Sequence, residues 1–360
     1  MAKIEEPTIN VKLFIEKKKK KVLFAESDEE FVDVLFSFLT MPLGTIVRLF
    51  GKQSQMGCLD EVYKSVEDLS TDYFQTKACK AMLLAPLNAA SSHCCRLKIN
   101  VDNTKPWTAV YVCKDTKCCA HGENAFSSFS DTVCKCGKVM QYHGERPQNG
   151  GNTNTAAVRY EDGVFVKRCM KFIITDDLEV APSSTSLLLS LFQKFEVRDP
   201  ADLEQKTVEL STEKITSLLK RALTSKQPLT GHYFDVPITT DEASIATHTR
   251  PPKLDQVFEA EHKLDNVKIR VLQTLSDSSL LYAEVGDDFV DLLFGLLSVP
   301  LGSVLKIFGP WASKGCLDNL YRSIDGSAQG CMRPECQSLL LAPDLAPSFG
   351  CSATGILPVD

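Results

Sequence analysis

Residues 23–65 read LFAESDEEFVDVLFSFLTMPLGTIVRLFGKQSQMGCLDEVYKS, and residues 281–323 read LYAEVGDDFVDLLFGLLSVPLGSVLKIFGPWASKGCLDNLYRS. The two stretches align without a gap at an offset of 258 residues, and 20 of the 43 positions are identical. After one deletion the match continues at an offset of 257, as far as Cys94 and Cys351. We therefore interpret the chain as two copies of one folding module.

Each copy begins with β-prone residues on both sides of a polar connection, which predicts a β-hairpin. In the first copy the connection carries the five lysines Lys17–Lys21, whereas the second copy has TLSDSS at 274–279. The fold therefore does not need the lysines, and we interpret them as a solvated hairpin tip. A patch for nuclear import or lipid binding is the alternative interpretation.

Helices are expected after each hairpin. The Ser-x-x-Glu pattern of a capping box starts at Ser27, and apolar residues at helical spacing follow it. Pro42 disfavours helical backbone at the residue before it, so this helix should end there and a second one should reach Phe50. A third, amphipathic helix should begin at Leu59. The apolar stretch Met82–Pro86 fits either a strand or a packed loop.

Two apolar runs, Phe31–Phe50 and Phe289–Phe308, are each long enough to cross a bilayer. Both contain an acid and a base as well as a central Pro-Leu-Gly. Charges inside a bilayer are costly. We therefore predict a pair of buried helices split at the proline in each copy, and no transmembrane segment.

The overall composition is that of a globular protein with two or three domains. The chain has 360 residues, 44% hydrophobic and 24% charged. Its net charge of -6 gives no general attraction to nucleic acid, so no specific nucleic-acid binding is expected. The sequence starts with no recognisable signal peptide and has 14 cysteines. This cysteine content indicates a reducing compartment, the cytoplasm or the nucleus.

The sharpest chemical pattern is Cys113-x4-Cys118 followed by Cys134-x-Cys136-Gly137. Two close cysteine pairs separated by a connection are typical of a tetrahedral zinc site. Cys119 or His121 could replace Cys118, and four buried reduced thiols are the alternative to a metal. With four protein ligands no coordination position remains for a substrate, so we predict a structural zinc ion.

The predicted fold class is α+β, with four segments along the chain. The first repeat module spans 8–100 and the second spans 264–352. A zinc-ribbon-like segment at 101–142 and a middle α/β segment at 157–235 lie between them. In the middle segment, strands are expected at 163–166 and 170–175 and helices at 186–195 and around Ile215, while 227–265 should be a linker.

Other cysteines and acids have plainer interpretations. Three cysteine pairs recur with the module, and we expect buried packing for them: Cys58 with Cys316, Cys79 with Cys336, and Cys94 with Cys351. Asp33 and Asp291 lie within predicted helices among apolar residues. An ion pair with Arg48 or Lys306 is the preferred interpretation, and a catalytic acid of raised pKa is the alternative. Asp176 and Asp177 should cap a turn, although they could bind a metal.

Several catalytic and nucleotide-binding motifs are missing from the sequence. It has no Walker A motif, no Gly-x-Gly-x-x-Gly after a strand, no His-Glu-x-x-His and no Gly-x-Ser-x-Gly. Its six histidines are scattered. The sequence therefore predicts no catalytic residue.

Several segments together resemble a plant family catalogued as domain of unknown function six-seven-four. These are KVLFAE from Lys21, DFVDLLF from Asp288, PLG from Pro42 and Pro300, GCLDNLY from Gly315, LKIN from Leu97, CKCGKVM from Cys134 and ITDDLEV from Ile174. The resemblance covers nearly the whole chain and implies tandem copies with a similar cysteine pattern. We expect this chain to hold one complete unit and the first part of another. The resemblance implies no activity, substrate or catalytic residue.

These observations favour a non-enzymatic intracellular protein-interaction or scaffold protein with a structural zinc site, acting with a protein partner. An enzyme that uses acids such as Asp33, Asp176 and Asp177 in a cleft between modules is one alternative. Association with a membrane surface through Lys17–Lys21 is the other.

Overall fold

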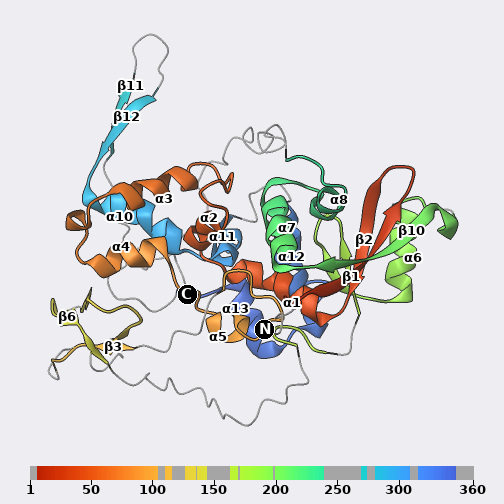
Figure 1. Ribbon diagram of the computed structural model, residues 1–360, viewed down its shortest axis with the longest axis horizontal. Coiled ribbons are helices and arrows are strands. Elements are labelled where there is room, and N and C mark those ends of the chain that lie inside the picture. Colours follow the sequence, from red (N-terminus) through yellow and green to blue (C-terminus); the bar gives the residue numbers. More distant parts are fainter. Residues whose placement is uncertain are drawn as a thin grey trace, which may run out of the picture.

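The computed structural model describes residues 6–103, 110–115, 126–134, 136–143, 163–168, 171–197, 199–238, 269–273, 280–308 and 315–345. Helices and small antiparallel sheets make up this part of the chain, so the α+β class is confirmed. Figure 1 shows a sheet with its helices at one end of the molecule and helices α3, α4 and α10 at the other. The hairpin β11–β12 projects away from both groups (Figure 1).

The first series of elements starts with an antiparallel pair of strands joined by exposed lysines at 17–20. Its members are β1 (Ile9–Glu16), β2 (Lys21–Ser27), α1 (Glu29–Ser37), the 3-10 helix η1 (Phe38–Thr40), α2 (Leu43–Leu49), α3 (Leu59–Asp68), η2 (Thr71–Tyr73), α4 (Lys77–Leu84) and α5 (Ser91–Cys94). The break at Pro42 and the burial of α1 and α2 are as predicted.

Two local expectations in this series are wrong. Ser27 belongs to β2, and α1 begins after Asp28 without a side-chain cap, so the capping box does not form. The stretch Met82–Pro86 was expected as strand or loop, but it begins inside helix α4. Thr76 caps this helix by accepting a hydrogen bond from the backbone N–H of Cys79. Because this capping residue lies before the apolar run, the hydrophobicity of the run alone does not reveal the helix.

The second series has the same order of strands and helices. It comprises β11 (Ile269–Gln273), β12 (Leu280–Val285), α10 (Asp287–Gly295), η6 (Leu296–Ser298), α11 (Leu301–Phe308), α12 (Cys316–Asp325), η7 (Gln329–Cys331) and α13 (Pro334–Leu341). Many side chains of α10 are only half-buried, in contrast to those of α1. Among the described residues, no helix is long and apolar enough to cross a membrane.

Some contacts recur at equivalent positions of the two series. The Tyr63 hydroxyl donates to the carbonyl of Leu84 over 2.8 Å, and the Tyr321 hydroxyl donates to the carbonyl of Leu341 over 2.6 Å. Both hairpins have the same strand register, and it shifts at the same place, after Phe14 in one and after Leu272 in the other.

A five-stranded antiparallel sheet in the order β10-β1-β2-β8-β9 surrounds the first hairpin. The added strands are β8 (Phe172–Thr175), β9 (Val180–Pro182) and β10 (Leu203–Leu210). Helix α6 (Thr185–Lys194) covers one face, where Leu191 packs with Phe14 and Phe24. Helices α7 (Thr212–Thr224) and α8 (Pro228–Tyr233) pack on the other face, and η4 (Pro200–Asp202) precedes β10.

The middle of the chain agrees with the sequence in part. Strand β8 and helices α6 and α7 were predicted, whereas β10 was not. The expected linker at 227–265 is wrong at its start, where α8 is helical; residues 239–265 lie outside the described part. The strand expected at 163–166 is instead a single bridge between Val166 and Met332.

The two series meet at their Pro-Leu-Gly segments. Pro42 and Pro300 form an antiparallel bridge. The Leu43 N–H donates to the carbonyl of Val299, and the Leu301 N–H donates to that of Met41, both over 2.9 Å. A continuous core joins α1 and α7 to helix α12, which contributes Leu317, Leu320 and Ile324.

A methyl group at this meeting point should destabilise the protein. A Cβ at Gly44 would lie 2.9 Å from the carbonyl oxygen of Leu297, closer than atoms can pack. We expect Gly44→Ala to lower the free energy of unfolding by about 1–3 kcal/mol, measured by urea denaturation. Gly330→Ala is the control, because a Cβ there meets no atom within 4 Å. Equal stability of the two variants would contradict the close contact.

Candidate functional site

Five two-residue strands form the framework of the cysteine-rich segment. One sheet has the order β4-β3-β7, and β5 and β6 form a separate hairpin. The strands are β3 (Tyr111–Val112), β4 (Phe126–Ser127), β5 (Thr132–Val133), β6 (Val139–Met140) and β7 (Tyr142–His143). Such short strands bury little apolar surface, so the segment needs another source of stability.

Three of the four predicted ligands meet at the ends of these strands. Cys113 follows β3, while Cys134 and Cys136 lie in the turn between β5 and β6. The Cys134 N–H donates to the carbonyl of Lys138, and the Gly137 N–H donates to that of Cys134, each over 2.8 Å. Gly137 has a φ of +81°, a backbone conformation that favours glycine. The turn therefore directs two sulfurs toward Cys113.

The sulfur positions fit a metal ion. The three Sγ atoms all lie within 4.8 Å of one another, and those of Cys113 and Cys136 are 3.5 Å apart. Zn–S bonds of about 2.3 Å in a tetrahedron require sulfurs roughly 3.7 Å apart. Cys113 and Cys134 are buried, and Cys136 is half-buried. This group could hold a metal ion. Cys118, Cys119 and His121, from which a fourth ligand was expected, lie outside the described residues.

The cysteines that recur with the module do not join this cluster. Burial raises the pKa of Cys94 and of Cys316 to about 12 and that of Cys336 to about 11. These thiols are neutral packing groups, as predicted. Cys58 is exposed and Cys79 is half-buried, so the prediction is wrong for Cys58. Cys351 lies outside the described residues.

Asp33 binds the backbone of a distant segment. Its Oδ2 accepts a hydrogen bond from the N–H of Val164 over 2.5 Å. Its Oδ1 accepts from the N–H groups of Phe165 and Val166 over 2.8 and 3.0 Å. The side chain is only 2% exposed, and burial raises its pKa to about 6 although the three hydrogen bonds lower it. The expected ion pair with Arg48 is therefore wrong.

Asp176 has a comparable structural role. Its carboxylate accepts hydrogen bonds from the N–H of Thr230 over 2.8 Å and from its hydroxyl over 2.7 Å. The N–H of Val22 in turn donates to the Thr230 hydroxyl, so the acid joins α8 to β2. Burial raises the pKa of Asp176. Asp177 accepts from the hydroxyl of Thr175, as expected for an acid that closes a turn.

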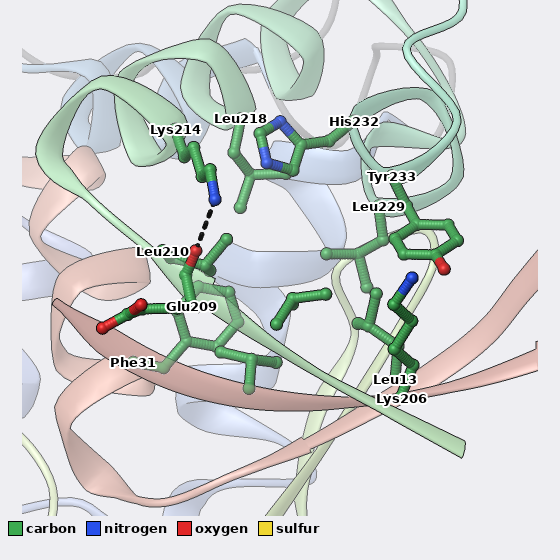
Figure 2. Close-up of a pocket in the computed structure, with 12 residues that line it drawn as sticks. Leu13, Phe31, Lys206, Glu209, Leu210, Lys214, Leu218, Leu229, His232 and Tyr233 are labelled. Atoms are coloured by element: carbon green, nitrogen blue, oxygen red, sulfur yellow. Dashed lines mark hydrogen bonds between the residues drawn. The ribbon is translucent and has the colours of Figure 1, made fainter.

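A pocket of about 240 Å³ lies between strands β1 and β10 and helices α7 and α8 (Figure 2). Its apolar lining includes Phe31 and Leu218, and Lys206, Lys214 and His232 add polar groups. The Lys214 ammonium donates to the carbonyl of Glu209 over 2.8 Å. The lining comes from distant parts of the chain, so no local sequence pattern pointed to it. Its polar groups do not include Asp33 or Asp176.

The family model described as "Protein of unknown function (DUF674)" matches residues 5–360. The chain belongs to this family. The match spans both series of elements and the cysteine-rich segment. No curated protein and no solved structure matches the sequence significantly. Membership in DUF674 thus supports the family resemblance inferred from the sequence motifs, and it assigns no chemistry to the cysteines or the acids.

Replacing Asp33 tests the contribution of its hydrogen bonds to the backbone of residues 164–166. Asn has one carboxamide oxygen for three N–H donors, so we expect Asp33→Asn to lower the free energy of unfolding by about 2 kcal/mol at pH 7.5. The loss of stability relative to wild type should grow as the pH falls. The pKa of Asp33 is higher in the folded state than in the unfolded state, so protonation of Asp33 stabilises the folded wild-type protein, whereas the amide of the variant does not titrate. This stabilisation of the wild-type protein by protonation of Asp33 is complete below about pH 4 and is lost as the pH rises through about 6.

Urea denaturation of both proteins between pH 4 and pH 7.5 measures this difference. Asp344→Asn is the control, since Asp344 is exposed. It should change stability by less than about 0.5 kcal/mol. A pH-independent difference for Asp33→Asn, or an equal loss in the control, would contradict the role of the buried carboxyl.

Proposed function

We propose that this DUF674 protein is a non-enzymatic protein-interaction or scaffold protein built from two copies of one module, with a structural zinc ion. None of the ten cysteines that the structure describes forms a disulfide. This agrees with a reducing compartment, the cytoplasm or the nucleus. The buried acids Asp33 and Asp176 accept hydrogen bonds from protein groups, which supports a structural use for them.

The proposed duplication rests on matched sequence and matched contacts. The hydrogen bonds of the Tyr63 and Tyr321 hydroxyls lie at equivalent positions of the two series, and the two hairpins have the same strand register. Ser303 donates to the carbonyl of Pro343 over 2.9 Å, and Thr45 donates to that of Pro86 over 3.4 Å. Independent sequences would not be expected to repeat such side-chain contacts.

The interaction role rests on the exposed apolar surface of the hairpin β11–β12. Leu281 is 60% exposed and Tyr282 is 51% exposed. The corresponding residues of the first hairpin, Leu23 and Phe24, are 1% and 0% exposed. Tyr282 lies opposite the exposed Leu272 on the neighbouring strand, and exposed apolar patches can mark interaction sites. No comparable observation favours an enzyme, and two of the lysines proposed for membrane contact, Lys18 and Lys19, form ion pairs with Asp202 and Glu16.

The zinc proposal rests on the cluster of Cys113, Cys134 and Cys136. Thiolates suit zinc because it is borderline-soft and redox-inert. The surrounding strands have two residues each, and a metal bound by cysteines from the end of β3 and from the β5–β6 turn would hold them together. Cys118 is the proposed fourth ligand, with Cys119 or His121 as the alternatives.

Metal analysis tests the zinc site. We expect purified protein to carry about one zinc per chain, measured by inductively coupled plasma mass spectrometry. Cys134→Ser should reduce the content severalfold, because three ligands bind zinc far more weakly than four. Cys58→Ser is the control, as Cys58 is exposed and distant in sequence. Wild-type protein with well under one zinc per chain would rule the site out.

The interaction role is tested by affinity purification of the full chain from its source cells after chemical cross-linking. We expect proteins other than the chain itself to be recovered, and replacing Leu281 and Tyr282 together with Lys should reduce their yield at least about tenfold. Leu189→Lys is the control, because Leu189 is exposed on α6, away from the hairpin. Unchanged recovery with the hairpin variant would refute the proposed interaction surface.

A further inference from the structure

The first hairpin shows which strands and helices cover a hairpin of this sequence. Strand β10 pairs antiparallel with β1 over eight residue positions, from Ile9 opposite Leu210 to Glu16 opposite Leu203. Strand β8 pairs with the other edge, along β2. Helix α6 covers one face through Leu191, and α7 contributes to the other. Both edges and both faces of this hairpin are therefore occupied.

The second hairpin keeps the apolar side chains and has none of these partners among the described residues. Within the described part of the chain, its sheet consists of β11 and β12 alone. Val271, which corresponds to the buried Leu13, is 46% exposed, and Ile269 and Leu272 are also exposed. An isolated two-stranded sheet is marginally stable in water, and an open apolar edge favours pairing with another strand.

We propose that the edge of β11 pairs with β11 of a second copy of this chain, antiparallel about a two-fold axis. The two hairpins then form one four-stranded sheet. A second copy is the favoured occupant because every copy carries the same uncovered strand, and one isologous contact covers both. This inference rests on the proposed interaction role of the hairpin and adds a second copy of the chain as the partner of its β11 edge.

The sequence of β11 is self-complementary in this arrangement. With the axis at Val271, the two Val271 side chains lie opposite each other and form a cross-strand pair of β-branched residues. Arg270 then faces Leu272 of the other copy, and Ile269 faces Gln273. No like charges stand opposite each other. The charge of Arg270 is already paired with Glu284 of its own hairpin over 3.0 Å.

The edge of β11 is preferred over that of β12 for two reasons. Its counterpart β1 accepts an antiparallel neighbour along its whole length, whereas β2 pairs with β8 over four positions only. Strand β12 is also followed, after Gly286 alone, by helix α10. We therefore place the contact between the two copies, and its two-fold axis, on β11.

Sedimentation equilibrium of the full chain tests the proposal. We expect a concentration-dependent species of twice 39.8 kDa. Val271→Asp and Val271→Lys should each give monomers, because like charges then face each other across the axis. An equimolar mixture of the two variants should restore the dimer, since Asp then faces Lys. Leu189→Lys, on the exposed surface of α6, should dimerise as wild type does.

Three outcomes would overturn the proposal. They are a wild-type chain that stays monomeric up to about 100 μM, a dimer unaffected by either charge at position 271, and a mixture of variants that does not reassociate. Circular dichroism of each variant verifies folding, which a change at an exposed strand position should leave intact. A monomer that still recovers other proteins through Leu281 and Tyr282 would overturn the dimer and leave the proposed function standing.

Discussion

The structure depends on a close approach of two backbones, at Gly44 and Gly302. A Cβ at Gly302 would lie 2.9 Å from the carbonyl oxygen of Leu340 and 3.0 Å from that of Leu39, matching the crowding around Gly44. Glycine at both places permits the two hydrogen bonds between the Pro-Leu-Gly segments. Helix α12 of the second series can then complete the core around α1. The fold is thus organised around a contact between corresponding residues, and side chains larger than hydrogen would destabilise it.

Corresponding segments of the chain have unequal surroundings. Asp33 is buried against the N–H groups of residues 164–166, whereas Asp291 is exposed. Leu23 lies under α6, whereas Leu281 is exposed. The sequences differ little at these places, so the difference comes from the covering elements and not from the module. The middle segment supplies that cover once, to the first hairpin. Function is therefore to be sought where similar residues are left uncovered, and in the cysteine cluster, which has no counterpart among the described residues of the second series.

The sequence predicted features whose cause is local. Helices α1 and α2 and their break at Pro42 follow from apolar spacing and proline geometry, and the meeting of Cys113, Cys134 and Cys136 follows from ligand spacing. Features with a distant cause were missed. Strand β10 reads LEQKTVEL, a mostly polar sequence that becomes a strand by pairing with β1. The donors to Asp33 lie more than 130 residues away, where sequence offers a nearby Arg48 but no sign of three backbone amides.

The pairing of β1 with β10 also affects how the chain is made. Ile9 leaves the ribosome about 200 residues before its partner Leu210, and translation at 5–20 residues per second separates them by roughly 10–40 s. During that interval the nascent hairpin exposes apolar faces that α6 and α7 later cover. Helix α12 emerges later still. The N-terminal strands therefore lack their final cover for much of synthesis, and slower decoding between β2 and β10 would prolong that exposure.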